Sequence, residues 1–124
     1  MTAALVATVL VCGGAAAVLR YLVAVWFAAD GRFPWAVLVV NVIGSALGGL
    51  VLALGTALPG EVQLVLLTGV AGGLTTFSTF SVETVQLVMD GRTRTAALNV
   101  GVNFGAGLAV TALAYAVTLA GFAP

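Results

Sequence analysis

The sequence contains no histidine and no lysine, a single cysteine, and few charged residues of either sign. These gaps exclude typical zinc sites, Cys–His or Ser–His–Asp catalysis, and intrachain disulfides, because each needs residues that the chain does not have. The four cations balance the four anions, so no basic patch would attract nucleic acid. We therefore expect neither an enzyme nor a nucleic-acid-binding protein.

A soluble domain normally carries about 25% charged residues, whereas this chain has 6%, together with 62% hydrophobic residues. A membrane-crossing helix needs ~20 mostly apolar residues. Four segments reach this length: residues 3–27, 35–57, 61–89 and 95–121. The sequence thus predicts an all-α membrane protein, a single transmembrane domain over residues 1–124 with four helices, short loops and antiparallel neighbours. The alternative, a soluble helical bundle, would need a protein shell that this chain cannot provide.

The arginines indicate how the chain lies in a cell membrane. The first segment has no basic residue before its apolar run, unlike a secretory signal, so we expect a retained span. One side holds Arg32, Arg92 and Arg94, with Arg20 near that end of the first span. The termini and the second loop, on the other side, contain no arginine. Because positively charged loops prefer the cytoplasm, both termini are predicted to lie outside.

The third segment is interrupted by polar residues at about mid-membrane depth. Residues 72–81 read GGLTTFSTFS, and such glycines and hydroxyl side chains lower helix propensity and compete for backbone hydrogen bonds. A continuous helix over 61–89 would also extend ~43 Å against a ~30 Å hydrocarbon core. We therefore predict a break near residues 72–76, where freed carbonyls could hold a cation and a new helix N-terminus would favour an anion. The alternative is a packing kink with the hydroxyls bonded back to the helix.

Polar side chains on two other spans fall at spacings that would face such a break. Asn41 and Ser45 lie four residues apart on the second span. The fourth span repeats polar or small residues every four positions, in a slowly winding stripe: Asn99, Asn103, Gly107, Thr111 and Tyr115. The stripe is either a path lined by hydrogen-bond donors or a set of side chains that hold helices together.

Phe77 and Phe80 lie three residues apart beside the hydroxyl groups. Ring edges are electropositive, so a small anion could touch them between neutral donors, which replace hydration without trapping the ion. Otherwise these rings fill the core. Arg20 and Glu83 are ionisable groups within or near the spans and need partners or water. Alternatively, Arg20 snorkels to the interface and Glu83 caps or pairs near the end of its span.

Glycines recur on the second and fourth spans, where they allow helices to approach closely: Gly44, Gly48, Gly49, Gly101 and Gly105. Part of this packing would lie within the chain. A single four-helix unit is nevertheless too thin to enclose polar groups away from lipid, so we expect an oligomer.

Residues 72–81, followed by Glu83, resemble the signature of the Fluc fluoride channels, also called the CrcB family. The resemblance extends over nearly the whole chain. CGGAAAVLRY at residues 12–21 is similar to the glycine-rich first span of the family, and NVIGS at residues 41–45 to its Asn-x-x-Gly-Ser motif. The resemblance implies passive fluoride export across a prokaryotic cell (inner) membrane, by an antiparallel dimer with two pores and a structural sodium ion at the dimer interface.

By motif position, the resemblance also implies roles for individual residues. Phe77 and Phe80 would coordinate fluoride edge-on, with Asn41 as a pore donor. The other implied roles are a polar track in the pore (Ser78 and Thr79), a vestibule (Arg20), the end of the pore (Glu83), and this chain's share of the sodium site through backbone carbonyls (Gly72 and Thr75).

Some features differ from the family pattern. The fourth span of the family usually carries Tyr and then Ser where this chain has Asn99 and Asn103, which we place in the pore as donors of different reach. Cys12 and Ala16 replace glycines of the first span. The one-sided arginines are unlike a homodimer that inserts in both orientations. We therefore expect a dimer with a homologous second chain, with a homodimer as the alternative.

Two other function classes are alternatives. A small four-span multidrug exporter is similar in length, but it needs a carboxylate in its first span, where this chain has Arg20 and no acid. In a noncatalytic membrane assembly subunit, the polar stripe would only hold helices together.

Overall fold

The computed structural model of the chain describes residues 1–27 and 33–122. The first loop and its Arg32, which enter the predicted orientation, lie outside the described residues. The described residues form four helical spans: α1 (Ala3–Phe27); α2 (Trp35–Leu54) with the 3₁₀ turn η1 (Gly55–Ala57); α3 (Gly60–Leu64), the π-helix η2 (Val65–Ala71), α4 (Gly72–Leu74) and α5 (Phe77–Met89); and α6 (Thr93–Phe122).

The prediction of an all-helical chain with four helices apolar enough to cross a membrane is confirmed. The helical spans cover Ala3–Phe27, Trp35–Ala57, Gly60–Met89 and Thr93–Gly121. The largest difference from the predicted bounds is at the last span, which begins at Thr93 rather than at residue 95.

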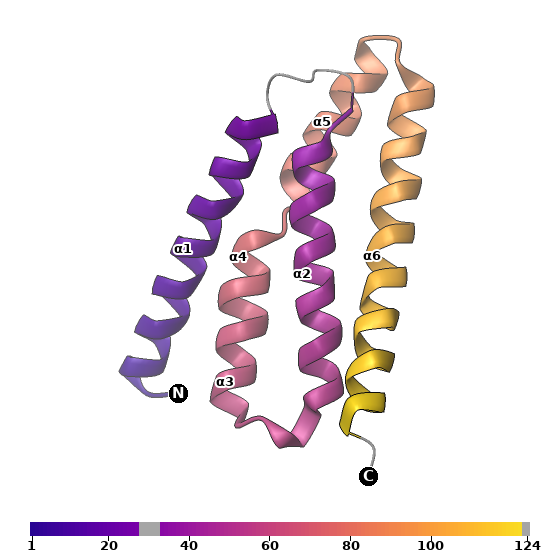
Figure 1. Ribbon diagram of the computed structural model, residues 1–124. Helices are drawn as coiled ribbons and strands as arrows, with labels where there is room; N and C mark the ends of the chain where they lie inside the picture. The colour runs from indigo at the N-terminus through magenta and orange to yellow at the C-terminus, as the bar shows by residue number, and fades with distance from the viewer. Residues whose placement is uncertain (28–32, 123–124) are drawn as a thin grey trace.

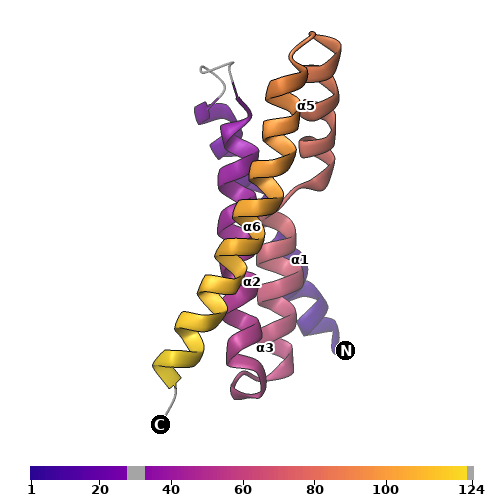
Figure 2. The same cartoon turned by 90° about the vertical axis from the view of Figure 1, so that its right-hand side faces the viewer.

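The spans run alternately in opposite directions, so the start of α1 and the end of α6 lie at the same end of the molecule (Figure 1). The lower part of the third span, η2 with α4, contacts both α1 and α2. On the other side, α2 packs extensively against α6, which crosses it at a tilt (Figure 2). The α2 helix therefore lies between the lower part of the third span and α6, whereas α5 contacts α6 directly.

The interior of this bundle is small. Its buried apolar side chains include Ala16 on α1, Val40 and Val51 on α2, and Leu87 on α5. Many large apolar side chains of α1 and α6 instead project outward, among them Leu10, Val11, Trp26, Leu108, Leu113 and Val117. Such an apolar exterior suits lipid tails or another apolar chain rather than water.

The turn between the third and fourth spans is built around Gly91. The N–H of Gly91 donates to the carbonyl of Val88 over 3.0 Å, and the N–H of Arg92 donates to that of Leu87 over 2.8 Å. This pair of hydrogen bonds is the Schellman pattern, whose left-handed residue is usually glycine. Gly91 has φ +74°. The short turn therefore satisfies the last carbonyls of α5 and leads directly into α6.

Two close approaches between helices depend on glycine. A Cβ atom at Gly49 would collide with the backbone carbonyl of Thr111 on α6, and one at Gly44 would collide with the side chain of Thr75. At the other three glycines predicted to allow close approach, Gly48, Gly101 and Gly105, a Cβ would meet no atom within 4 Å in the described chain. Gly101 and Gly105 are exposed, and packing of these three against a second chain stays a prediction.

The adjacent glycines of α2 give a matched test of this packing. We expect Gly49→Ala to lower the free energy of unfolding by about 1–3 kcal/mol, because overpacking must push α6 away from α2. Gly48→Ala meets no neighbour and should be neutral or slightly stabilising. The measurement is the thermal unfolding midpoint of each purified variant in detergent. Equal midpoints for the two variants would contradict the proposed contact with Thr111.

Candidate functional site

The third span leaves helical geometry at two threonines. Thr75 has φ −73° and ψ 156°, and Thr76 has φ −147° and ψ 119°, so both are extended between the end of α4 and the start of α5. They lie within the predicted range of residues 72–76. The two glycines of that range, however, remain helical within α4. A Cβ at Gly73 would collide with the carbonyl of Gly13 on α1, so this glycine serves close packing rather than the change of direction.

A π-helix, which sequence patterns did not indicate, precedes this region. In η2 the backbone is wider than in an α-helix, a feature often found near functional sites. Gly69 lies in this widened segment, where a Cβ would approach the carbonyl of Val9 to 3.2 Å and the side chain of Cys12 to 3.3 Å. The absence of a side chain at Gly69 therefore lets the wide turn pack tightly against α1.

Side chains from α1 and α2 satisfy the backbone of the extended threonines. Oδ1 of Asn41 accepts from the N–H of Thr76 over 2.8 Å, and Nδ2 of Asn41 donates to the carbonyl of Thr76 over 3.4 Å. Nη1 of Arg20 donates to the carbonyl of Thr75 over 3.0 Å. Non-helical backbone at this depth is tolerated only when protein or water satisfies it. Asn41 and Arg20 provide that satisfaction here.

The start of α5 is stabilised by the hydroxyl of Thr76. Its Oγ1 accepts from the N–H of Thr79 over 3.1 Å and donates to the hydroxyl of Thr79 over 3.0 Å. Ser78 shares a third contact with it, at 3.3 Å between the two hydroxyl oxygens. Thr76 is therefore the N-cap residue of α5, and it gathers the hydroxyl groups of the first turn around itself.

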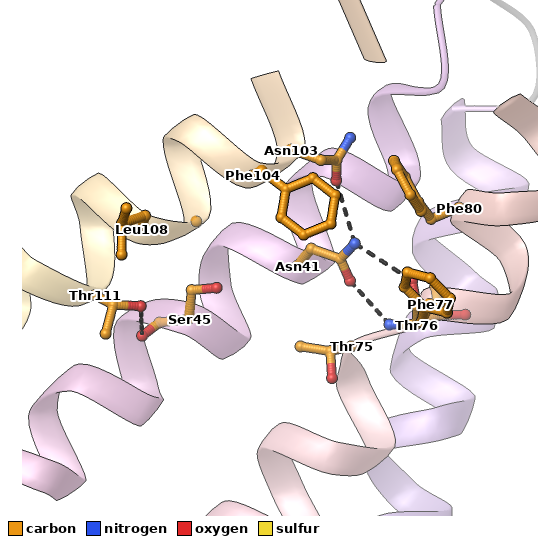
Figure 3. A pocket seen from close by; sticks show the side chains of 11 residues that line it. Asn41, Ser45, Thr75, Thr76, Phe77, Phe80, Asn103, Phe104, Leu108 and Thr111 are labelled. Carbon is orange, nitrogen blue, oxygen red and sulfur yellow. Dashed lines mark hydrogen bonds between the residues drawn. The ribbon is translucent and has the colours of Figure 1, made fainter. Parts of the chain in front are cut away.

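A cavity of about 410 Å³ opens beside this break, between α2, α5 and α6 (Figure 3). Its lining combines amides, hydroxyls and aromatic rings: Asn41, Ser45, Thr75, Thr76, Phe77, Phe80, Asn103, Phe104, Gly107, Leu108 and Thr111. None of these described lining residues is charged. Thr111 closes one end by donating its hydroxyl to the carbonyl of Ser45 over 3.1 Å.

Three phenylalanine rings form one wall of the cavity. The ring centroids of Phe77 and Phe80 lie 5.8 Å apart, with 39° between their planes. Phe80 meets Phe104 of α6 in a T-shaped contact, at 5.9 Å and 89°. Phe80 is only 7% exposed, whereas Phe77 is 73% exposed. One ring is therefore fixed within the chain, while the other stands at its open edge.

Amide side chains form a continuous series of hydrogen bonds from this cavity into the α5–α6 contact. Nδ2 of Asn41 donates to Oδ1 of Asn103 over 3.2 Å. Nδ2 of Asn103 donates to both the side-chain and backbone oxygens of Asn99, over 2.8 and 3.0 Å. Nδ2 of Asn99 donates to the hydroxyl of Thr84 over 2.9 Å. We call Asn41, Asn103, Asn99 and Thr84 the amide ladder.

The structure brings only part of the predicted pore set to this cavity. Asn41, Phe77, Phe80 and Asn103 line it. Asn99 does not: it is 0% exposed and lies behind Asn103 in the ladder. Ser78 and Thr79 are exposed rather than part of this lining.

The predicted vestibule and pore-end residues meet in a second, smaller cavity. This space of about 230 Å³ is lined in part by Arg20, Thr76, Thr79 and Glu83. Glu83 also lines a third cavity of about 280 Å³ near Trp35. Its Oε2 atom is buried without a hydrogen-bond partner in the described chain. Thr76 borders both the first and second cavities, which therefore adjoin at the break.

Three residues of the site were assigned no role from the sequence. Thr76 was one hydroxyl among five, and its position as N-cap depends on where the helix breaks. Thr84 lies four residues after Phe80, and this i, i+4 spacing could have placed it beside the ladder. Phe104 is adjacent to Asn103 but off the four-residue stripe, so periodicity gave no signal for it.

The predicted sodium ligands are backbone carbonyls. The described residues contain no cluster of three or more His, Cys, Asp or Glu side chains placed to hold a metal ion. The carbonyl of Thr75 already accepts from Arg20, which leaves one of its two lone pairs and places a positive charge nearby. Hard cations are usually coordinated by about six oxygen atoms. Two carbonyls are too few for a cation site on their own, so the sodium site stays a prediction.

The N-cap role of Thr76 can be tested by stability. We expect Thr76→Ala to lower the free energy of unfolding by about 1 kcal/mol, because the N–H of Thr79 loses its acceptor. Thr76→Ser keeps a hydroxyl and should resemble the unaltered chain. Thermal unfolding in detergent gives the stability, and hydrogen exchange at Thr79 reports the local effect. If the Ala variant exchanges as slowly as the Ser variant, Thr76 does not cap α5.

Comparisons with known proteins agree with these features. A family model described as "CrcB-like protein, Camphor Resistance (CrcB)" matches residues 7–115. A relative from Variovorax paradoxus (strain S110), named fluoride-specific ion channel FluC, is 40% identical over 106 residues, covering 82% of this chain and 85% of the relative. A relative of the same name from Geobacter sulfurreducens (strain ATCC 51573 / DSM 12127 / PCA) is 50% identical over 93 residues, covering 71% and 75%. Because the matches span most of both chains, this protein belongs to the CrcB-like family.

Proposed function

We propose that this chain is a fluoride-selective ion channel that lowers cytoplasmic fluoride by passive export across the cell membrane. The observation that carries the proposal is the uncharged cavity between α2, α5 and α6, where amides and hydroxyls face phenylalanine rings. The relatives' shared name, fluoride-specific ion channel, supports the same conclusion.

The chemistry of the lining suits a small, strongly hydrated anion. Neutral amide and hydroxyl donors replace water around the ion without holding it as tightly as a fixed cation would. The electropositive edges of Phe77 and Phe80 add attraction that does not depend on a charge. The Asn41 amide lies beside these rings (Figure 3). We assign fluoride coordination to Phe77 and Phe80, with Asn41 as a donor.

The remaining residues extend the path on either side of the break. Ser78 and Thr79 are exposed hydroxyls at the first turn of α5, and we place them in the polar track. Arg20 and Glu83 border the second cavity. In this proposal Arg20 attracts anions in a vestibule, and Glu83 marks the end of the pore.

The working unit is proposed to be an antiparallel dimer, with a second copy or with a homologous second chain. Phe77 is 73% exposed, and the cavity beside it opens at the surface of a single chain. Lipid cannot satisfy polar groups there, so a protein partner has to cover them. The carbonyls of Gly72 and Thr75 would then contribute half of a shared structural sodium site, whose positive charge would hold the two breaks together.

Fluoride transport is tested with purified protein in liposomes. Vesicles loaded with potassium fluoride should release fluoride far faster than matched vesicles release chloride, as measured with ion-selective electrodes. Phe80→Ile should reduce fluoride release by at least about tenfold, because the aliphatic side chain lacks the electropositive ring edge. Trp26→Ile, at an exposed position of α1 that lines none of the three cavities described, is the aromatic-to-aliphatic control.

Two outcomes would contradict the proposed function. Equal fluoride and chloride release would contradict fluoride selectivity, and a Phe80→Ile variant that matches the Trp26→Ile control would contradict the aromatic site. Free release from this chain alone would also show that no second type of chain is required.

The arginine pattern leads us to propose that both termini lie outside the cytoplasm. Arg92 and Arg94 lie at the α5–α6 turn, at the end of the molecule opposite the start of α1 (Figure 1). A reporter fused to the C-terminus should therefore be active outside the cytoplasm. A reporter found in the cytoplasm in every molecule would reverse the proposed orientation. A mixture would favour a homodimer with both orientations.

A further inference from the structure

Backbone groups at two points determine which terminal atom of each amide in the ladder is the oxygen and which is the nitrogen. The N–H of Thr76 can only donate, so the Asn41 atom 2.8 Å away is the oxygen Oδ1. Nδ2 of Asn41 then faces Asn103, whose facing atom must accept and is Oδ1. At the other end, the backbone carbonyl of Asn99 can only accept, so the Asn103 atom 3.0 Å away is Nδ2. Both ends therefore require the same orientation of Asn103.

This orientation uses all the amide donors that border the cavity. A side-chain amide nitrogen has two N–H groups. Those of Asn41 donate to the carbonyl of Thr76 and to Asn103, and those of Asn103 both donate to Asn99. Asn103 is 8% exposed and Asn99 is fully buried, so water does not readily replace these partners. In this arrangement an anion beside Asn41 finds no unused amide N–H.

We propose that Asn103 is a positioning residue that latches one N–H of the Asn41 amide, so that an anion gains this donor by displacing the oxygen of Asn103. The inference rests on the proposed function and gives it a site of control. Asn103 directs its partly negative Oδ1 toward Asn41, and this oxygen attracts the donor that an anion needs. The residue predicted from the sequence as a pore donor thus acts as a competing acceptor.

The bond to Asn103 gives a partner to an N–H of Asn41 that would otherwise be unsatisfied. If Asn41 lost its bond to Asn103, one amide N–H beside three aromatic rings would lack a partner, which is costly away from water. An arriving anion compensates for that loss by accepting the same N–H in a charge-assisted bond, which is stronger than the neutral one it replaces. The exchange therefore couples opening of the latch to the presence of the ion.

Replacing Asn103 by serine tests the latch. The serine hydroxyl is too short to reach Asn41 while it bonds back to the carbonyl of Asn99. In fluoride-loaded liposomes, Asn103→Ser should release fluoride about fivefold faster than the unaltered chain, the factor that corresponds to one neutral hydrogen bond. Val102→Ala, on the neighbouring exposed position of α6, is the control for general loosening of the helix and should leave the rate unchanged.

A second variant separates positioning from a general structural effect. In an Asn41→Ala background the latch has no donor to hold, so adding Asn103→Ser should give no further increase in fluoride release. A general loosening of α6 would instead change fluoride release by a similar factor in both backgrounds, because that effect does not require Asn41. Non-additivity of about fivefold is therefore the expected signature.

If dimer assembly limits the rate of transport, a direct measurement of fluoride binding still tests the latch. Nitrogen-15 NMR of the Asn41 side chain in detergent should show fluoride-dependent shifts, with half-saturation at about fivefold lower fluoride in Asn103→Ser than in the unaltered chain. Equal fluoride dependence in the two proteins, or slower release from Asn103→Ser, would overturn the latch while leaving the proposed function intact. Absence of both fluoride release and fluoride-dependent shifts in all variants would overturn the proposed function and the latch together.

Discussion

The arrangement of the site depends on one constraint: two extended threonines interrupt a helix in apolar surroundings, and their backbone groups must find partners within the protein. Asn41 takes both the N–H and the carbonyl of Thr76, and Arg20 takes the carbonyl of Thr75. These bonds tie α2 and α1 to the third span at one level. Because Asn41 also donates to Asn103, α6 is attached at the same level. The polar layer of the protein is thus organised around the break.

Glycine contacts let the helices come close enough for those bonds. Gly49 allows the backbone of α6 at Thr111 to touch α2, and Gly73 allows the third span to touch α1 at Gly13. The Gly49 contact joins α2 to α6, and the Gly73 contact joins the third span to α1. Space remains at the break between α2, α5 and α6. The cavity is therefore a consequence of close packing below it and of an extended segment beside it.

The proposed function places two demands on one amide. Asn41 must satisfy the backbone of Thr76 for the fold, and it must offer an N–H to a passing anion. Its oxygen and one N–H meet the first demand by bonding Thr76, which leaves one N–H for the second. Asn103 competes for that N–H. In this proposal Asn103 therefore bears on access to the site as well as on the attachment of α6.

The sequence alone determined the features that follow from composition and periodicity. Low charge and four apolar runs predicted four spanning helices, and the glycines and hydroxyls of residues 72–81 predicted an interruption near residues 72–76, because local propensity bears on both. Tertiary structure decided the rest. It made Gly73 a packing contact and made Thr75 and Thr76 the extended pair. Only the approach of α1 shows that Gly73 cannot carry a Cβ. It also set the direction of each amide, because a sequence shows that Asn103 has both a donor and an acceptor, whereas its neighbours alone decide which of the two faces Asn41.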